Sequence, residues 1–153
     1  MQCEPMQVKI RCLKTMSMMI KKYSDLQSLY SFADRFEYLM LPGIVGDSTF
    51  GFDRYINQKF YSSREWKEVR NYVIVRDDGC DLGVPGYEIN DGIIIHHINP
   101  MVSDDIVHGE SWILDPEYLI TTTKETHNAI HYGNMSIIKP RYVERFPGDT
   151  KLW

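Results

Sequence analysis

The first regular pattern of apolar positions in the chain predicts an amphipathic helix that begins at Ser24. The Ser24 hydroxyl can cap a helix N-terminus, and Pro42-Gly43 would stop the helix at its far end. The apolar positions between these limits follow a period near 3.6 residues: Leu26, Leu29, Tyr30, Ala33, Phe36 and Met40. We therefore expect one face of this helix to pack on the core.

A second helix is predicted to begin at Ser62-Ser63. Ser62 and Glu65 have the spacing of a capping box, in which a hydroxyl and a carboxylate satisfy free N–H groups of the first turn. The apolar face of this helix is expected to carry Trp66, Val69, Tyr72 and Val73. The preceding residues 43–60 are rich in glycine and aromatic residues and predict a loop with one short element.

The middle of the chain predicts a β-hairpin that ends in two histidines. Residues 87–89 have strand character, Asn90-Asp91-Gly92 is a strong turn sequence, and residues 92–98 are apolar and β-branched. His96 and His97 lie at the end of this second strand.

A long acidic loop over residues 100–116 and a short apolar bridge over residues 117–120 are predicted to separate the hairpin from a third helix. Thr122-x-x-Glu125 is a second capping box, and the helix is expected to cover residues 123–132. Gly133 is in place to end it in a left-handed conformation.

Length and composition fit a single globular domain. The chain has 153 residues, of which 43% are hydrophobic and 25% charged, and it shows no repeat or long linker. We expect one domain over residues 24–153, preceded by an extension over residues 1–23 that is partly disordered. Apolar runs of only a few residues predict no membrane span, and no export signal is visible. The three widely spaced cysteines form no C-x-x-C pair, so a cytoplasmic location is expected.

The charge of the chain is unevenly distributed. Formal net charge is -4, which argues against binding to nucleic acid through a broadly basic surface. Residues 76–120 contain one basic residue, Arg76, against ten acidic residues, and the ends of the chain are more basic. An acidic centre fits a cation site with phosphate-contacting flanks, but an ordinary solvated acidic surface explains the same distribution.

Four of the five histidines fall in two tight pairs, and this clustering is the main functional feature of the sequence. His127 and His131 are four residues apart on a predicted helix, so both can present a ring nitrogen to one ion. A third nitrogen from the hairpin would complete the set and leave positions open for water and substrate. Imidazole suits zinc, nickel and copper, while a phosphate-bound site can also use magnesium or manganese. Taken singly, each histidine is better explained as a hydrogen-bonded core residue or a solvated surface residue.

His96 and His97 are expected to have separate roles. Adjacent residues on a strand point to opposite sides, so the two side chains are not expected to bind the same ion. One can ligate the metal while its neighbour acts as a general base on a water beside a phosphate, because imidazole titrates near neutral pH.

Three stretches of the sequence together resemble the motif of the HNH endonucleases. They are Ile95-His96-His97-Ile98-Asn99-Pro100, Asp115-Pro116-Glu117-Tyr118-Leu119-Ile120 and Thr126-His127-Asn128-Ala129-Ile130-His131-Tyr132-Gly133. The upstream residues 60–70 and Arg76-Asp77 are similar to the segment that precedes the motif in these nucleases, and the motif core covers about residues 86–133. The resemblance implies an α+β fold with a ββα-metal (His-Me finger) centre and additional N-terminal helices.

The resemblance also implies an activity and a role for each paired histidine. Members of the family are DNA endonucleases that hydrolyse phosphodiester bonds with a divalent metal ion, and small stand-alone members in bacteriophages and mobile elements act as nicking or packaging-associated nucleases. His97 would be the general base, and the metal ligands would be His96, His127 and His131. The implied cofactor is one divalent ion (Mg²⁺, Mn²⁺, Ni²⁺ or Zn²⁺). The implied partners are DNA and phage packaging proteins, for a monomer or homodimer in the host cytoplasm.

The sequence departs from the family pattern at the bridge. Tyr118 stands where the family usually has an asparagine that braces the metal loop and the base, and Thr126 replaces a frequent cysteine. Asp115 or Asn128 could take over the bracing, or Tyr118 could pack the hairpin on the helix. The alternatives to an enzyme are a non-catalytic module that binds metal and DNA, and a structural zinc site closed by a fourth protein ligand.

Four basic residues are the first candidates for contacts to DNA phosphates. Lys67 and Arg70 lie on the exposed face of the second predicted helix, and Arg141 and Arg145 alternate with aromatic residues near the C-terminus. Exposed basic residues on a helix usually serve only solvation, and aromatic residues in a tail often anchor it to the core.

Overall fold

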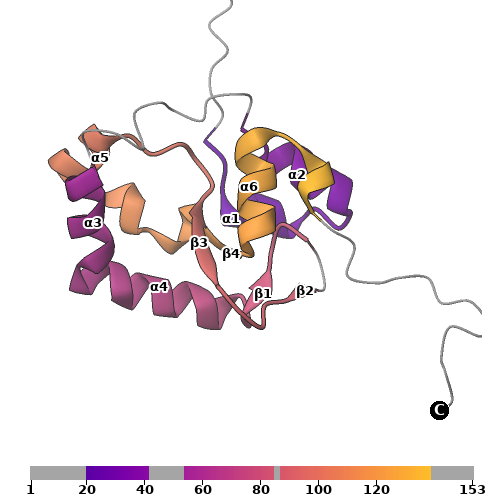
Figure 1. Cartoon of the computed structure of the whole chain (residues 1–153), viewed down its shortest axis with the longest axis horizontal. Coiled ribbons are helices and arrows are strands. Elements are labelled where there is room, and N and C mark those ends of the chain that lie inside the picture. Colours follow the sequence, from indigo (N-terminus) through magenta and orange to yellow (C-terminus); the bar gives the residue numbers. More distant parts are fainter. Residues whose placement is uncertain (1–19, 42–53, 85–86, 139–153) are drawn as a thin grey trace, which may run out of the picture.

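The fold is described from a computed structural model, which places residues 20–41, 54–84 and 87–138 (Figure 1). The helices in these residues are α1 (Tyr23–Gln27), α2 (Phe32–Leu39), α3 (Arg54–Ser62), α4 (Arg64–Arg76), α5 (Ser103–His108) and α6 (Lys124–Tyr132). The strands are β1 (Cys80–Asp81), β2 (Tyr87–Glu88), β3 (Ile94–His97) and β4 (Leu119–Thr122). Short 3-10 helices are η1 (Ser111–Leu114), η2 (Pro116–Tyr118) and η3 (Met135–Ile137). The described part of the chain is thus an α+β structure, and no helix in it combines the length and apolar content needed to cross a membrane.

Strands β3 and β4 form the antiparallel pair around which the other elements are arranged. Ile94 pairs with Thr122 and His97 with Leu119 at the two ends of the register. Helix α6 follows β4 directly and packs against β3, while α4 contacts both strands (Figure 1). Strands β1 and β2 form a second, shorter antiparallel pair.

The hairpin predicted across Asn90-Asp91-Gly92 does not form. Gly92 adopts the left-handed conformation (φ 68°) that such a turn needs, but the strands on either side pair with other partners. β2 joins β1, and β3 joins β4, whose sequence predicts only a short bridge. The reason is that all four residues of β4 are buried, so pairing with β4 removes more apolar surface from water than pairing with the partly exposed residues of β2.

The helix predicted to begin at Ser24 is divided into α1 and α2. Helix α1 is short, and Ser31 starts a new helix by accepting a hydrogen bond from a backbone N–H of its first turn at 3.1 Å. Tyr30, expected on the apolar face, lies in the connection and is exposed. Ser24 lies inside α1, and its hydroxyl donates to the Glu117 carboxylate instead of capping the helix.

Helices α4 and α6 begin one residue later than predicted. Their N-cap hydroxyls are those of Ser63 and Thr123, which accept a backbone N–H of the first turn at 3.1 and 3.2 Å. Ser62 is still part of α3 and Thr122 is paired in β4, so neither residue is available as the cap. Gly133 ends α6 in the left-handed conformation (φ 60°), as predicted.

Two stretches predicted as loops contain helices. The described part of residues 43–60 belongs to α3, a helix of nine residues, and residues 42–53 lie outside the described residues. Residues 100–116 contain α5 and η1 instead of one long acidic loop. At the start of α5 the Val102 N–H donates to the Asp105 carboxylate at 2.8 Å, so an acidic residue of this stretch holds a helix start.

Buried side chains form one hydrophobic cluster on each face of the β3–β4 pair. The cluster toward α6 consists of Leu26, Leu39, Leu41, Ile98, Ile120 and Ile130. The cluster toward α3 and α4 consists of Phe60, Trp66, Val73, Ile95, Ile113 and Leu119. Because successive side chains of a strand alternate in direction, the two strands contribute to both clusters. The β3–β4 pair is therefore buried on both faces.

Two buried carboxylates hold the outer edge of β4. Asp77 accepts hydrogen bonds from the N–H and the hydroxyl of Thr121 at 2.9 and 2.8 Å. Asp81 accepts the same two kinds of bond from Thr123, also at 2.9 and 2.8 Å. Between them, the Leu82 N–H donates to the Thr121 carbonyl at 3.0 Å. The segment from Asp77 to Leu82 thus satisfies backbone groups of the β4 segment on the side away from β3.

Removal of the Asp81 carboxylate is expected to destabilise the protein by about 3 kcal/mol or more. Hydrogen bonds to a charged acceptor contribute about 1.5–3 kcal/mol each, and the buried Thr123 N–H would lose its partner. Urea unfolding of Asp81→Ala measures the loss as a lower midpoint. The control is Asp91→Ala, at an exposed acid, with an expected change within about 0.5 kcal/mol. Equal midpoints for the two variants would contradict the anchoring role of Asp81.

Candidate metal centre

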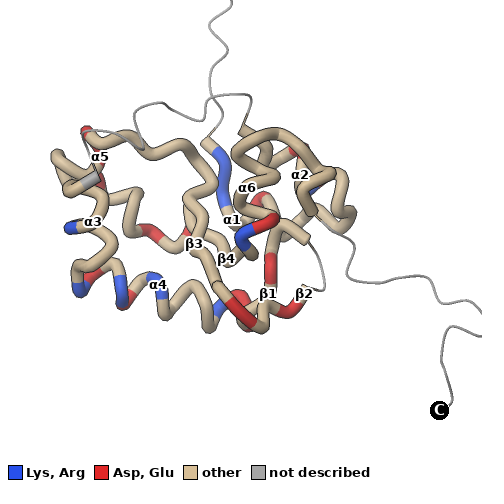
Figure 2. The backbone as a smooth tube through the Cα atoms, in the orientation of Figure 1, with Lys and Arg blue, Asp and Glu red and all other residues tan. Residues whose placement is uncertain are grey.

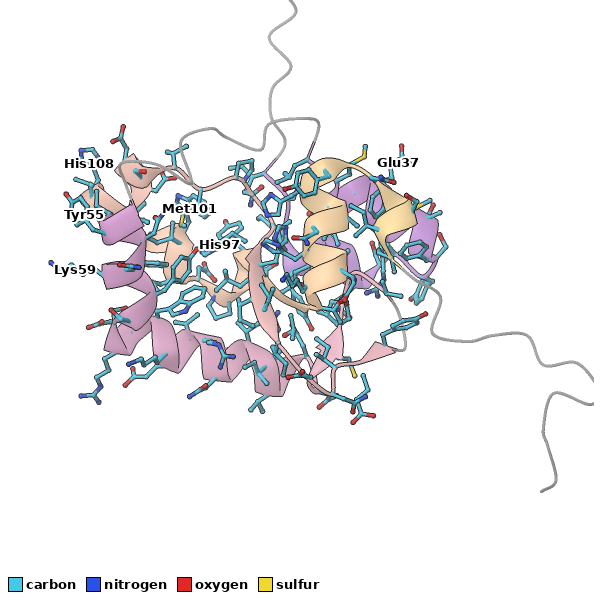
Figure 3. All side chains as sticks on the ribbon, in the orientation of Figure 1. Glu37, Tyr55, Lys59, His97, Met101 and His108 are labelled. Atoms are coloured by element: carbon cyan, nitrogen blue, oxygen red, sulfur yellow. The ribbon has the colours of Figure 1, made fainter. Side chains whose placement is uncertain are left out.

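Strand β3 presents its two histidines to opposite faces of the β3–β4 pair. His96 faces α6, where its ring centroid lies 5.3 Å from that of His127 and 5.1 Å from that of His131. His97 faces α3 and α4, where its ring stacks on that of Trp66 at 5.4 Å (Figure 3). The predicted alternation of adjacent strand residues is confirmed, and only His96 joins the helical pair.

The histidine cluster, defined as His96, His127 and His131, brings three ring nitrogens together. One nitrogen from each residue lies within 4.8 Å of the others, and the Nε2 atoms of His127 and His131 are 3.2 Å apart. Two ligand nitrogens at about 2.0–2.1 Å from a tetrahedral Zn²⁺ are about 3.3 Å apart, so the helical pair already has the spacing of two ligands. Within the described residues, no other group of three potential ligands meets the same spacing.

The Nε2 atom of His96 is buried and has no hydrogen-bond partner in the described part of the chain. Only 2% of the residue is exposed. An unpaired buried polar atom costs about 1–3 kcal/mol, so native structures contain few of them. A cation held between this nitrogen and the two helical histidines would supply the missing partner. The cluster therefore fits a metal ion.

All three histidines of the cluster have lowered pKa values. Burial lowers the pKa of His96 well below its usual 6.5, and the neighbouring His127 and His131 lower it further. Burial, together with His127, lowers the pKa of His131 to about 4. Burial also lowers the pKa of His127, although a hydrogen bond with Asn128 raises it. The imidazoles are consequently neutral at pH 7, the form in which histidine binds metal ions.

The cluster contains no carboxylate from the described residues. Three imidazoles suit Zn²⁺ or Ni²⁺, and Mn²⁺ or Mg²⁺ could join them if phosphate oxygens completed the coordination. The acidic residues are instead spread over several elements (Figure 2), and some of them have structural roles, as at Asp77 and Asp81. The acidic middle of the sequence therefore does not mark the candidate metal centre.

His97 lies in an aromatic cage on the opposite face. The planes of the His97 and Trp66 rings differ by 15°, and the centroids of Phe60 and Trp112 lie 6.4 and 6.1 Å from that of His97. Its Nε2 lies 3.0 Å from the carbonyl oxygen of Ile113. Because a carbonyl only accepts hydrogen bonds, Nε2 carries the proton and Nδ1 has the free lone pair. Burial lowers the pKa of His97 to about 4, and 9% of the residue is exposed.

The three residues considered for bracing have different surroundings. Tyr118 packs edge-to-face on Trp112 at 6.2 Å between ring centroids, and Trp112 in turn contacts His97. Asp115 is exposed and caps η2. Asn128 is half-buried, adjoins His127 in α6 and raises the pKa of that histidine. Tyr118 thus has a packing role, and Asn128 is the one of the three that lies on α6, next to His127.

The surroundings of His97 include groups that the sequence pattern does not mark as functional. Trp66 is predicted only as a core position of its helix, and the Ile113 carbonyl belongs to the backbone, so no residue type indicates it. Lys67 and Arg70 lie on the same helix as Trp66, which borders the His97 face and not the histidine cluster. Arg141 and Arg145 lie outside the described residues.

The free energy of unfolding of the metal-free protein is expected to fall as the pH is lowered from about 6.5 to about 4. In this range the unfolded chain binds protons at His97 and His131 that the folded chain does not bind, so protonation favours unfolding. A shift from 6.5 to about 4 at the buried His97 corresponds to about 3 kcal/mol. Urea unfolding in EDTA across this pH range measures the slope, and His97→Gln should reduce it. A flat profile would contradict the assignment of neutral buried histidines.

No family model, curated protein or solved structure matches the chain.

Proposed function

We propose that the protein is a divalent-metal-dependent DNA endonuclease of the HNH type with a ββα-metal centre. The chain order β3, β4, α6 corresponds to the two strands and the helix of such a centre, with one histidine of the cluster on the first strand and two on the helix. The observation that carries the proposal is the meeting of His127 and His131 with the buried, unpaired Nε2 of His96. The motif resemblance supplies the reaction class.

The reaction in this proposal divides between the two faces of β3. A divalent cation bound by the histidine cluster would stabilise negative charge on the scissile phosphate and on the leaving oxygen. His97 has an unprotonated Nδ1 and would take a proton from the attacking water. Trp66 and the Ile113 carbonyl hold the ring and its tautomer, which is the task of the asparagine that Tyr118 replaces.

A non-catalytic module that binds metal and DNA is the second candidate function. The burial of His97, with 9% of the residue exposed, favours this alternative because a general base must reach a water molecule. The same centre would then bind a cation and a phosphate without turnover. Tyr118→Asn restores the family residue, and cleavage that appears only in this variant would support the non-catalytic alternative.

Purified protein is expected to convert supercoiled plasmid to the open-circular form in the presence of Mg²⁺, Mn²⁺ or Ni²⁺, and EDTA should stop the reaction. One metal centre cuts one strand, so a nick is the expected first product. Agarose gel electrophoresis over a time course measures the conversion. Plasmid that stays intact with every one of these ions would contradict the enzyme proposal.

Variants of the two faces are expected to separate cleavage from metal binding. His97→Ala should lower the cleavage rate by about 100-fold or more and change the Ni²⁺ dissociation constant by less than about twofold, since a base acts in the transition state. His131→Ala should raise the Ni²⁺ dissociation constant by at least about tenfold. Calorimetry and plasmid cleavage measure the two effects.

Two further variants control this comparison. His97→Gln keeps most of the volume in the aromatic cage and should reproduce the loss of cleavage if the base is what matters. His108→Ala, at an exposed histidine, should leave both quantities unchanged. If His97→Ala and His131→Ala lost metal affinity equally, the division of roles between the two faces would be wrong.

A further inference from the structure

The segment before α1 is fastened to the end of the histidine strand. The Lys21 N–H donates to the Asn99 side-chain oxygen at 2.9 Å, and the Asn99 side-chain N–H donates back to the Lys21 carbonyl at 2.9 Å. Asn99 follows His97 by two residues. Figure 2 shows a basic, blue segment that leads into α1. These long-range contacts therefore bring the Lys21 backbone to the end of β3, the strand that carries His96.

The ammonium group of Lys21 is held beside the C-terminal end of α6. Its Nζ donates to the Met40 carbonyl at 3.1 Å and lies 5.7 Å from the centre of the Tyr38 ring. The next residue, Leu41, donates its N–H to the carbonyl of Ile130 at 3.2 Å, one residue before His131. The ammonium thus lies at the same end of α6 as His131, and among the described residues only one of its three N–H groups has an acceptor.

No carboxylate in the described part of the chain neutralises the charge of Lys21. The ion pairs of the described residues join Arg64 to Glu68 and Arg76 to Asp77, and Lys21 has no acidic group within 4.0 Å among these residues. The side chain is partly buried, and burial lowers its pKa. The ammonium therefore carries a charge with no acidic partner among the described residues, beside the end of α6 that holds His131.

A lysine at this place opposes the binding of a cation alone. Two positive charges in a partly buried site repel each other, and each would have to be desolvated without a compensating charge. An anion that contacts both the cation and the ammonium is attracted by each of them, and this attraction outweighs the repulsion between the two positive charges. The arrangement is thus unfavourable for a bare metal ion and favourable for a metal ion with a bound anion.

We propose that Lys21 and the histidine cluster form one binding site for a phosphodiester, in which the ammonium donates to a non-bridging oxygen of the phosphate whose other oxygen meets the cation. This inference rests on the metal centre of the proposed function. A diester oxygen is the anion that a nucleic acid substrate supplies, and an ammonium binds it as a point charge. Lys21 is a substrate-binding group in this assignment, separate from the exposed Lys67 and Arg70.

The proposal requires that metal and phosphodiester strengthen each other's binding by the same factor. Calorimetric titration of the full chain with Ni²⁺, with and without saturating dimethyl phosphate, measures this coupling without any cleavage. Trimethyl phosphate is the matched ligand control, because it has a similar shape and no charge. In the wild type, dimethyl phosphate should lower the Ni²⁺ dissociation constant by about fivefold or more, and trimethyl phosphate should not change it.

Variants at two neighbouring lysines identify the group responsible. Lys21→Met keeps the two backbone contacts to Asn99 and should bind Ni²⁺ alone at least as tightly as the wild type, while the effect of dimethyl phosphate falls below about twofold. Lys21→Arg keeps the charge and should retain the coupling. Lys22→Met removes the same charge one residue away, at an exposed side chain, and should behave as the wild type. Thermal unfolding verifies that each variant is folded.

The results of these titrations and of the plasmid assay test the phosphodiester site and the nuclease activity separately. Coupling of equal size in the wild type and Lys21→Met, or no coupling in the wild type, would overturn the phosphodiester site. Coupling that is lost in Lys21→Met, with plasmid left intact by the wild type, would support the site and overturn the nuclease. Cleavage by a wild type without coupling would leave the nuclease and remove the role of Lys21. If the wild type bound Ni²⁺ neither alone nor with dimethyl phosphate, the phosphodiester site would be overturned, and plasmid cleavage with Mg²⁺ or Mn²⁺ would decide the nuclease.

Discussion

The anchoring of β4 by two buried carboxylates is the contact on which the remaining arrangement depends. A strand with both faces buried cannot leave backbone groups unpaired, and β3 reaches only one edge of β4. Asp77 and Asp81 meet the other edge through Thr121 and Thr123. Thr123 is also the N-cap of α6, so its contact with Asp81 helps to fix the residue at which the helix begins. The start of a helix sets which side chains face the strand, and the position of His127 therefore depends on Asp81.

Strand alternation then gives adjacent histidines different chemistry. On the α6 face, His96 meets two other imidazoles and keeps an unpaired buried nitrogen, which is the condition of a ligand without its ion. On the α4 face, His97 is stacked on Trp66 and bonded to the Ile113 carbonyl, which fixes one tautomer. Because β3 separates the two rings, the protein can make one of them a metal ligand and leave the other with a free lone pair. This separation underlies the division of roles in the proposed nuclease.

Within the described residues, the histidine cluster and the nearby Lys21 consist of neutral and positively charged groups. Three neutral imidazoles and the ammonium of Lys21 provide no negative group, although the chain as a whole is acidic. Several acidic residues are instead used as structural acceptors: Asp77 and Asp81 at β4, Asp105 at α5 and Asp115 at η2. In the proposed phosphodiester site, the negative charge comes from the ligand, a phosphate on a bound cation.

The sequence by itself determined the features that depend on local spacing. The pairing of His127 with His131, the opposite directions of His96 and His97, and the left-handed end of α6 at Gly133 follow from the periods of helix and strand and from the freedom of glycine. The starts of α4 and α6 were predicted to within one residue. The cap is the second of two adjacent hydroxyl residues because the first is already part of α3 or of β4. Only the tertiary structure decided which strands pair. The turn at Gly92 is compatible with a hairpin between β2 and β3, but β4, a buried strand further along the chain, competes with β2 as the partner of β3. The tertiary structure also decided the surroundings of His97, because its hydrogen-bond partner is a backbone carbonyl, which no residue type reveals. It decided the place of Lys21 as well, because a contact between residues 78 positions apart leaves no periodic pattern in the sequence.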